Sequence, residues 1–196
     1  MLSRLILASG SPRRLELLQA LRIPFEVYVP DVDESCSLPA DEAVYELSRR
    51  KGAASVPFFP DDYILSADTL VSVEGRSLGK PHSREEAVAM LRFLSGKTHQ
   101  VFTGMTVCSP GGGMLTSVDR SDVTFCDIPD EELNAYVDSG EPFDKAGGYA
   151  IQGRAGMWVS RMEGCSSAVI GLSLFLVRDL LLRSGFPLLE TLKSID

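Results

Sequence analysis

Two adjacent arginines, Arg13 and Arg14, follow a short apolar run and a turn of small residues at positions 9–11. Ser11 and Pro12 suit the cap and the first position of a helix, so both arginines fall in its first turn. Cations are unfavourable at that positive end of the helix dipole unless an anion binds there. Free backbone N–H groups and guanidinium groups would converge on such an anion. The corner therefore indicates a phosphate site, and the alternative is a solvated helix start.

Asp68 is a carboxylate inside an otherwise apolar run, residues 63–73, which predicts a central strand. An acid buried in a strand is costly unless it is paired, hydrogen-bonded or bound to a metal. The alternative is that residues 66–68 lie in a loop past the end of the strand. Asp68 would then still lie at the carboxyl end of a strand, where open α/β folds bind ligands. In either case Asp68 is a candidate to hold Mg²⁺ or to accept a proton from water.

Other segments carry groups that could face the same ligand. Lys51 and Lys80 add positive charge, and Pro81 stiffens the approach of the Lys80 ammonium. Residues 140–153 combine glycines, which let backbone approach a ligand closely, with the amide of Gln152. That amide can read both donors and acceptors of a planar base edge. The alternatives are solvated lysines and a flexible connector.

Two familiar motifs lack the context that their chemistry needs. Residues 95–98 resemble the end of a Walker A loop, but Leu91 stands where its first glycine must be. Residues 75–79 match the G-x-S-x-G motif of esterases, which would make Ser77 a nucleophile. That motif needs a strand–turn–helix context, whereas this stretch predicts a hairpin turn.

The composition limits the classes of partner. A chain of 196 residues, 44% of them hydrophobic, suits one globular unit or two small lobes that share a core. A net charge of -8 argues against nucleic acid or a membrane surface as a partner, so a local basic pocket must hold any anionic ligand. No run approaches membrane-spanning length. Four scattered cysteines and two histidines give little support for zinc and predict reduced thiols in a soluble cytoplasmic protein.

The elements that must position these groups alternate along the chain. Strands are expected at 5–8, 25–29, 63–73 and 157–162, and a long hairpin at 98–109 and 114–128. Helices are expected from Pro12, from an Asp41 cap through about 54, at 84–94 behind a capping box of Ser83 and Glu86, at 130–137, and finally at 172–182. This order predicts an α/β protein with a mixed twisted sheet flanked by helices.

Together, these segments resemble the Maf family of nucleotide pyrophosphatases. The matching pieces are residues 7–14, 66–71, 79–81, 94–101 and 144–153, in family order, with 171–174 closing the series. The resemblance implies one Maf/ITPase-like domain over residues 1–196, with two lobes around a central cleft. It also implies metal-dependent hydrolysis of dTTP and UTP, and of modified pyrimidine nucleotides, to the monophosphate and pyrophosphate, with Mg²⁺ or Mn²⁺ as the cofactor. A homodimer is plausible for the family.

The resemblance further implies a role for each candidate residue. Asp68 would accept a proton from the attacking water and, together with Glu34, would hold the metal. The residues that fall where the family distinguishes its substrates are Arg13, Thr69 and Gln152. The residues that would bind the triphosphate are Ser9, Arg14, Lys51 and Lys80.

The alternative function is a nucleotide-binding regulator of cell division or septum formation that does not turn its ligand over. The presence of Asp68 and Lys80 favours an enzyme, because a pure binder needs no acid to activate water. One departure concerns local structure: Ser173 stands where the family's closing motif usually has proline, which predicts a looser start of the last helix.

Overall fold

A mixed sheet of seven strands organises the chain, of which the computed structural model describes residues 4–193. The strands are β1 (Leu5–Ala8), β2 (Glu26–Tyr28), β3 (Tyr63–Val73), β4 (Arg76–Leu78), β5 (Thr98–Cys108), β6 (Met114–Phe125) and β7 (Val159–Glu163). They lie in the order β2-β1-β3-β5-β6-β7, and β4 pairs with β3. Strand β1 is parallel to β2 and β3, whereas the other pairs are antiparallel. The expected mixed sheet is confirmed.

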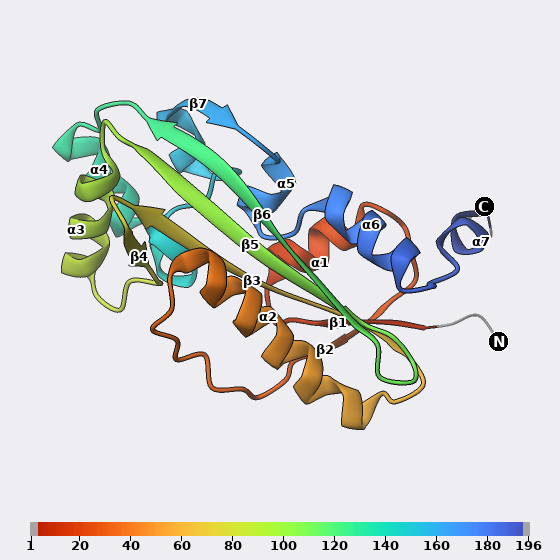
Figure 1. Cartoon of the computed structure of the whole chain (residues 1–196). Coiled ribbons are helices and arrows are strands. Elements are labelled where there is room, and N and C mark those ends of the chain that lie inside the picture. The colour runs from red at the N-terminus through yellow and green to blue at the C-terminus, as the bar shows by residue number, and fades with distance from the viewer. Residues whose placement is uncertain (1–3, 194–196) are drawn as a thin grey trace.

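Helices flank this sheet, and the long strands β5 and β6 run diagonally across the molecule between them (Figure 1). The α-helices are α1 (Pro12–Gln19), α2 (Ala40–Ser55), α3 (Arg84–Leu94), α4 (Asp130–Asp138), α5 (Ser166–Ile170), α6 (Leu174–Arg183) and α7 (Leu188–Lys193). Between α4 and β7 the chain forms short 3₁₀ turns, Glu141–Asp144, Ala146–Gly148 and Arg154–Trp158. Within residues 4–193, none of the helices has the length and apolar character needed to cross a membrane.

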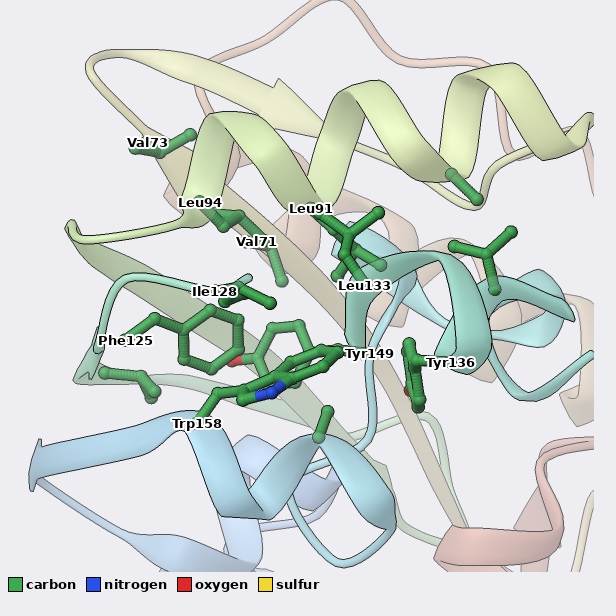
Figure 2. Packing of buried hydrophobic residues seen from close by; sticks show 14 of the residues in the cluster. Val71, Val73, Leu91, Leu94, Phe125, Ile128, Leu133, Tyr136, Tyr149 and Trp158 are labelled. Atoms are coloured by element: carbon green, nitrogen blue, oxygen red, sulfur yellow. The ribbon is translucent and has the colours of Figure 1, made fainter. Parts of the chain in front are cut away.

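Of three hydrophobic clusters in residues 4–193, the two largest pack at different ends of β3. One cluster joins its last residues, Val71 and Val73, to α3, α4, Tyr149 and Trp158. Figure 2 shows the rings of Phe125, Tyr149 and Trp158 close together within it, and the Phe125 ring meets the other two edge to face. The other cluster joins Leu65 and Ala67 of the same strand to apolar residues of α1 and α6. Because the long strands pass through both clusters, a single sheet connects the two.

The ends of several elements differ from the expectation. Asp41 does not cap α2, because the helix begins at Ala40 with Pro39 at the cap position. Asp41 lies instead in the first turn, where its charge complements the helix dipole. The capping box of α3 is formed only in part. The Ser83 hydroxyl accepts from the Glu86 N–H at 3.1 Å, but the Glu86 carboxylate accepts from the backbone N–H of His82.

The expected helix at 172–182 is confirmed as α6, and two short helices that were not expected, α5 and α7, lie on either side of it. Helices α5 and α7 have five and six residues, too few to produce a clear helical period in the sequence. Ser173 is buried at the start of α6, and its hydroxyl accepts from the Leu176 N–H at 3.5 Å. The Ser167 hydroxyl accepts from the Leu174 N–H at 3.1 Å. Two hydroxyl groups thus accept hydrogen bonds from N–H groups in the first turn of this helix, and one of them belongs to Ser173, which stands at the usual proline position.

Candidate active site

The candidate site forms where β3 lacks a neighbour on one side. Strand β1 pairs with β3 only as far as Ala8 beside Ser66, and β4 resumes the pairing at Val71. A cavity of about 640 Å³ lies at this gap, and Asp68 and Thr69 are in its lining. Asp68 pairs with Gly104 inside the β3–β5 ladder, so the alternative that residues 66–68 form a loop is wrong. A gap in the sheet, rather than the end of β3, lets the buried carboxylate face the cavity.

Asp68 is held by a lysine from the helix that covers its face of the sheet. Lys51 Nζ of α2 lies 2.6 Å from Asp68 Oδ1 and 2.9 Å from Glu34 Oε1. The side chains of Lys51 and Asp68 are each only 10% exposed. Burial would raise the pKa of the Glu34 carboxyl, but the hydrogen bond and charge of Lys51, with Lys80 and Arg14, lower it overall. Both carboxylates therefore share one ammonium group.

Small residues let α2 approach the sheet closely enough to bring Lys51 to this position. A Cβ atom on Gly104 would lie 2.1 Å from the backbone oxygen of Val44 in α2. On Gly52 it would lie 2.9 Å from Cys108 Sγ. The spacing between helix and sheet is thus set by two glycines, one of which is the register partner of Asp68.

Arg14 is buried on the other side of β3, where it contacts Thr69. Thr69 points to the face opposite that of Asp68, because successive side chains of a strand point to opposite faces. Its Nε donates to the Gly171 carbonyl at 2.9 Å, and its two Nη groups donate to the hydroxyls of Ser9 and Thr69 at 3.2 and 3.1 Å. Burial lowers the pKa of this guanidinium, and the charge of Asp68 opposes that shift. The expected cationic corner is present, with a guanidinium fixed from three directions.

Arg13 has different partners from its neighbour. Its Nη1 lies 2.7 Å from Asp144 Oδ2, and its Nη2 donates to the Asp144 carbonyl at 3.1 Å. Lys145 donates to the other oxygen of the same carboxylate. Sequence reasoning did not single out Asp144 and Lys145 among the candidates. Their charges in a glycine-rich segment were visible, but a partner 131 positions away was not.

The remaining candidates keep free polar groups. Lys80 and Gln152 are exposed and line the cavity. Within the described part of the chain, neither side chain makes a hydrogen bond or an ion pair, so both remain available to a ligand.

The fold brings every candidate residue to one cavity. Its lining includes all of them: Ser9, Arg13, Arg14, Glu34, Lys51, Asp68, Thr69, Lys80 and Gln152. With Lys145 added, the cationic side chains of the lining outnumber its carboxylates, although the chain as a whole carries a net charge of -8. The expected local basic pocket is therefore present.

The esterase motif lacks its structural context. Ser77 lies exposed in β4, after a tight turn at Glu74 and Gly75 with φ values of 51° and 75°. It is in a hairpin rather than a strand–turn–helix elbow. The cysteines Cys36, Cys108, Cys126 and Cys165 are all free thiols, as expected.

Glu34 and Asp68 are the oxygen donors that could hold a divalent cation. They already converge on one positive charge, the Lys51 ammonium. Across residues 4–193, no group of three or more His, Cys, Asp and Glu side chains is assembled for a metal. A carboxylate pair suits Mg²⁺, which is commonly bound by one or two carboxylates, with water and substrate phosphates as its other ligands. The donor set therefore fits a hard cation that binds together with a phosphate ligand.

Comparison with known proteins agrees with these features. Residues 4–184 match the family of Maf-like proteins. The chain belongs to the Maf family. It is 44% identical over 181 residues to a Bacillus cereus (strain AH187) protein named dTTP/UTP pyrophosphatase, a match that covers 90% of this chain and 94% of that relative. A Geobacillus sp. (strain WCH70) protein of the same name is 43% identical over 175 residues, or 88% and 94% of the two chains.

A solved structure supports the fold of this Maf family member. The Ham1 protein of Staphylococcus aureus superposes with a TM-score of 0.56 over 92% of this chain and 99% of its own. At 13% sequence identity, this likeness concerns the architecture alone.

Proposed function

We propose that this Maf family member hydrolyses dTTP and UTP to the nucleoside monophosphate and pyrophosphate. Relatives that are 44% identical over 90% of the chain carry the name of that activity. The observation that carries the proposal is the placement of Asp68, a carboxylate at a gap in the sheet, in a cavity lined by several cations. Hydrolysis of a phosphoanhydride depends mainly on positioning and on stabilising negative charge, which such a cavity supplies.

Phosphate binding is the role of the cationic corner. Arg14 is held in place by Ser9, Thr69 and Gly171, so little reorganisation is needed when an anion arrives. Lys80 has no ion-pair partner in the described chain and can move to the phosphates. Lys51 would add its charge from the α2 side, and Ser9 would contribute its hydroxyl.

Asp68 would accept the proton of the attacking water. Its Oδ1 receives the Lys51 hydrogen bond, whereas Oδ2 has no donor within residues 4–193. As the water oxygen bonds to phosphorus, its proton passes to this carboxylate. The bond from the α-phosphorus to the oxygen that bridges the α and β phosphates breaks, and pyrophosphate leaves with the electron pair of that bond.

Substrate selection would depend on Arg13, Thr69 and Gln152. The free Gln152 amide can read a pyrimidine edge, because it presents both a donor and an acceptor. Apolar groups such as Leu70, Val101 and Ile170 line the same cavity and provide a surface for the base. We extend the substrate range to modified pyrimidine nucleotides.

Glu34 and Asp68 would hold Mg²⁺ or Mn²⁺. When bound, the ion supplies charge neutralisation to the phosphates of the substrate. Lys51, which bridges the two carboxylates, keeps them close together.

We further place the protein in the cytoplasm as a single domain and expect a homodimer, which light scattering would test.

The deciding experiment is a phosphate-product assay. The purified protein with dTTP or UTP and Mg²⁺ or Mn²⁺ should release pyrophosphate and not orthophosphate. Absence of release across a panel of canonical and modified triphosphates would contradict the proposal. Tight nucleotide binding without release would instead support the nucleotide-binding regulator.

A further inference from the structure

A charged contact joins the two sides of the candidate cavity. Arg13 belongs to the first turn of α1, and Asp144 ends the first 3₁₀ turn of the glycine-rich segment. The guanidinium uses both Nη atoms on this residue, one on the carboxylate at 2.7 Å and one on the carbonyl at 3.1 Å. A two-point contact fixes the direction of the guanidinium plane as well as its position.

Asp144 also serves a second cation. Lys145 Nζ donates to its other carboxylate oxygen and to the Glu141 carbonyl, the latter at 2.6 Å. The side chains of Arg13 and Lys145 are 21% and 13% exposed, whereas that of Asp144 is 59% exposed. Two partly buried cations that line one cavity repel each other unless an anion lies between them. Burial would raise the pKa of the Asp144 carboxyl, but hydrogen bonds from Lys145 and Arg13 lower it overall.

The same segment is fixed to the opposite side by its backbone. The Gly147 N–H donates to the Gly79 carbonyl at 2.9 Å, next to Lys80. Gly147 has a φ of +70°, and a Cβ atom there would lie 2.9 Å from a Val71 methyl group. This end is thus held by tight packing and a backbone hydrogen bond. At the α1 end, the contact runs through the side chain of Arg13.

We propose that Asp144 is a positioning residue for the nucleotide. It holds Arg13, one of the proposed selecting residues, and Lys145 as one cationic pair that faces the nucleotide in the cavity. It also fastens the segment that carries Gln152 to the α1 corner, which sets the distance between the base-reading and phosphate-binding groups. This inference rests on the proposed function and adds a residue to its site.

The test is Asp144→Asn, which keeps the size of the side chain and removes its charge. Asp138→Asn is the matched control, because Asp138 pairs with Arg84 and its side chain is 58% exposed, but it lies outside the cavity lining. We expect the KM for dTTP to rise about tenfold in Asp144→Asn, with kcat within about threefold, because a partly buried ion-pair network is lost. Asp144→Glu, which keeps the charge, should recover most of that loss, and Asp138→Asn should leave KM unchanged.

A double variant separates positioning from a general structural role. If Asp144 acts through Arg13, Asp144→Asn should raise KM much less in an Arg13→Ala background than in the native chain. Equal increases in the two backgrounds would overturn the proposal. An unchanged KM in the single variant would also overturn it, and so would a lowered KM, since Asp144 would then compete with the substrate.

A binding measurement distinguishes this inference from the proposed function. Calorimetry with an α,β-methylene analogue of dTTP reports affinity without turnover. Weaker binding by Asp144→Asn in a protein that releases no pyrophosphate would overturn the proposed activity and keep the role of Asp144. Normal pyrophosphate release with unchanged analogue binding by Asp144→Asn would overturn the role of Asp144 alone.

Discussion

The two walls of the cavity are built in different ways. The strand wall consists of Asp68 and Thr69 of β3, with Lys51 of α2 and Arg14 of α1, and its charged groups are buried. The glycine wall, residues 141–152, consists of short 3₁₀ turns, and Asp144 and Gln152 on it are exposed. Side chains on regular elements are held more precisely than those on irregular segments. The difference places the proposed proton transfer on the rigid wall, and Gln152, one of the three proposed selecting residues, on the adaptable one.

The backbone of each wall follows from its sequence. In the strand wall, alternation along β3 directs Asp68 toward Lys51 and Thr69 toward Arg14. In the glycine wall, Gly147 and Gly148 have φ values of 70° and 71°, which other residues rarely adopt. If the comparison is correct, changes in the strand wall should lower kcat, and changes in the glycine wall should act mainly on KM.

The largest effect is expected from Asp68→Asn in the strand wall. An amide cannot accept the proton of water, so kcat should fall by about 10³-fold. Pyrophosphate release measures the loss, and thermal unfolding checks that the variant is folded. Asp62→Asn is the control, because Asp62 is equally buried and pairs with Arg4 away from the cavity. Turnover of Asp68→Asn close to that of the native chain would remove Asp68 from its role.

A smaller effect is expected from Gly104→Ala, which tests how the strand wall is spaced. The new methyl group would overlap the Val44 carbonyl, so α2 must move away from the sheet and take Lys51 with it. The free energy of unfolding should fall by about 1–3 kcal/mol, as for other overpacked sites, and kcat should fall as well. Urea unfolding and pyrophosphate release measure the two effects.

Gly52→Ala provides a graded comparison for that variant. Its Cβ would meet the side chains of Cys108 and Ser66, which can adjust, rather than backbone. We therefore expect a smaller loss of stability than for Gly104→Ala. A destabilised Gly104→Ala variant with unchanged kcat would show that the spacing of α2 does not control Lys51.

The smallest effect at neutral pH concerns His99, which contacts Tyr149 of the glycine wall. It is buried, its Nε2 lies 2.8 Å from the Tyr149 hydroxyl, and its Nδ1 has no hydrogen-bond partner within the described residues. Burial lowers the pKa of His99 from 6.5 to about 4. As the pH falls, His99 therefore binds a proton at a higher pH in the unfolded chain than in the folded chain. Stability should be fully present above pH 6.5 and fall by roughly 1 kcal/mol per pH unit as the pH drops toward 4.

Urea unfolding between pH 4.5 and 7 in His99→Gln should show a flatter dependence than in the native chain. His82→Gln is the control, because His82 is the other histidine and is exposed. Equal pH dependence in the His99 variant and the native chain would contradict the assignment.

Sequence patterns predicted the strand wall better than the glycine wall. The apolar run at 63–73 coincides with β3, because a long buried strand has a clear composition. Residue patterns alone pointed to Arg13, Arg14, Lys51, Asp68, Lys80 and Gln152, the family resemblance added Ser9, Glu34 and Thr69, and all of them line the cavity. The gap between β1 and β4 could not be predicted, because it depends on which strands pair and in what register. The contact of Arg13 with Asp144 was missed for the same reason, since no local pattern encodes a partner so distant in sequence.

The pairing of Asp68 with Gly104 has a consequence for the order in which parts of the molecule unfold. This pair lies inside the β3–β5 ladder, in a sheet whose strands run through both hydrophobic clusters. Amide hydrogens in such a region exchange with solvent only through global opening, whereas those of irregular surface segments exchange through local fluctuations. If residues 141–152 opened locally, Gln152 would no longer contact the base, while Asp68 would keep its place in the β3–β5 ladder. We therefore expect binding of the base to be lost first on warming and the carboxylate of Asp68 to be displaced last.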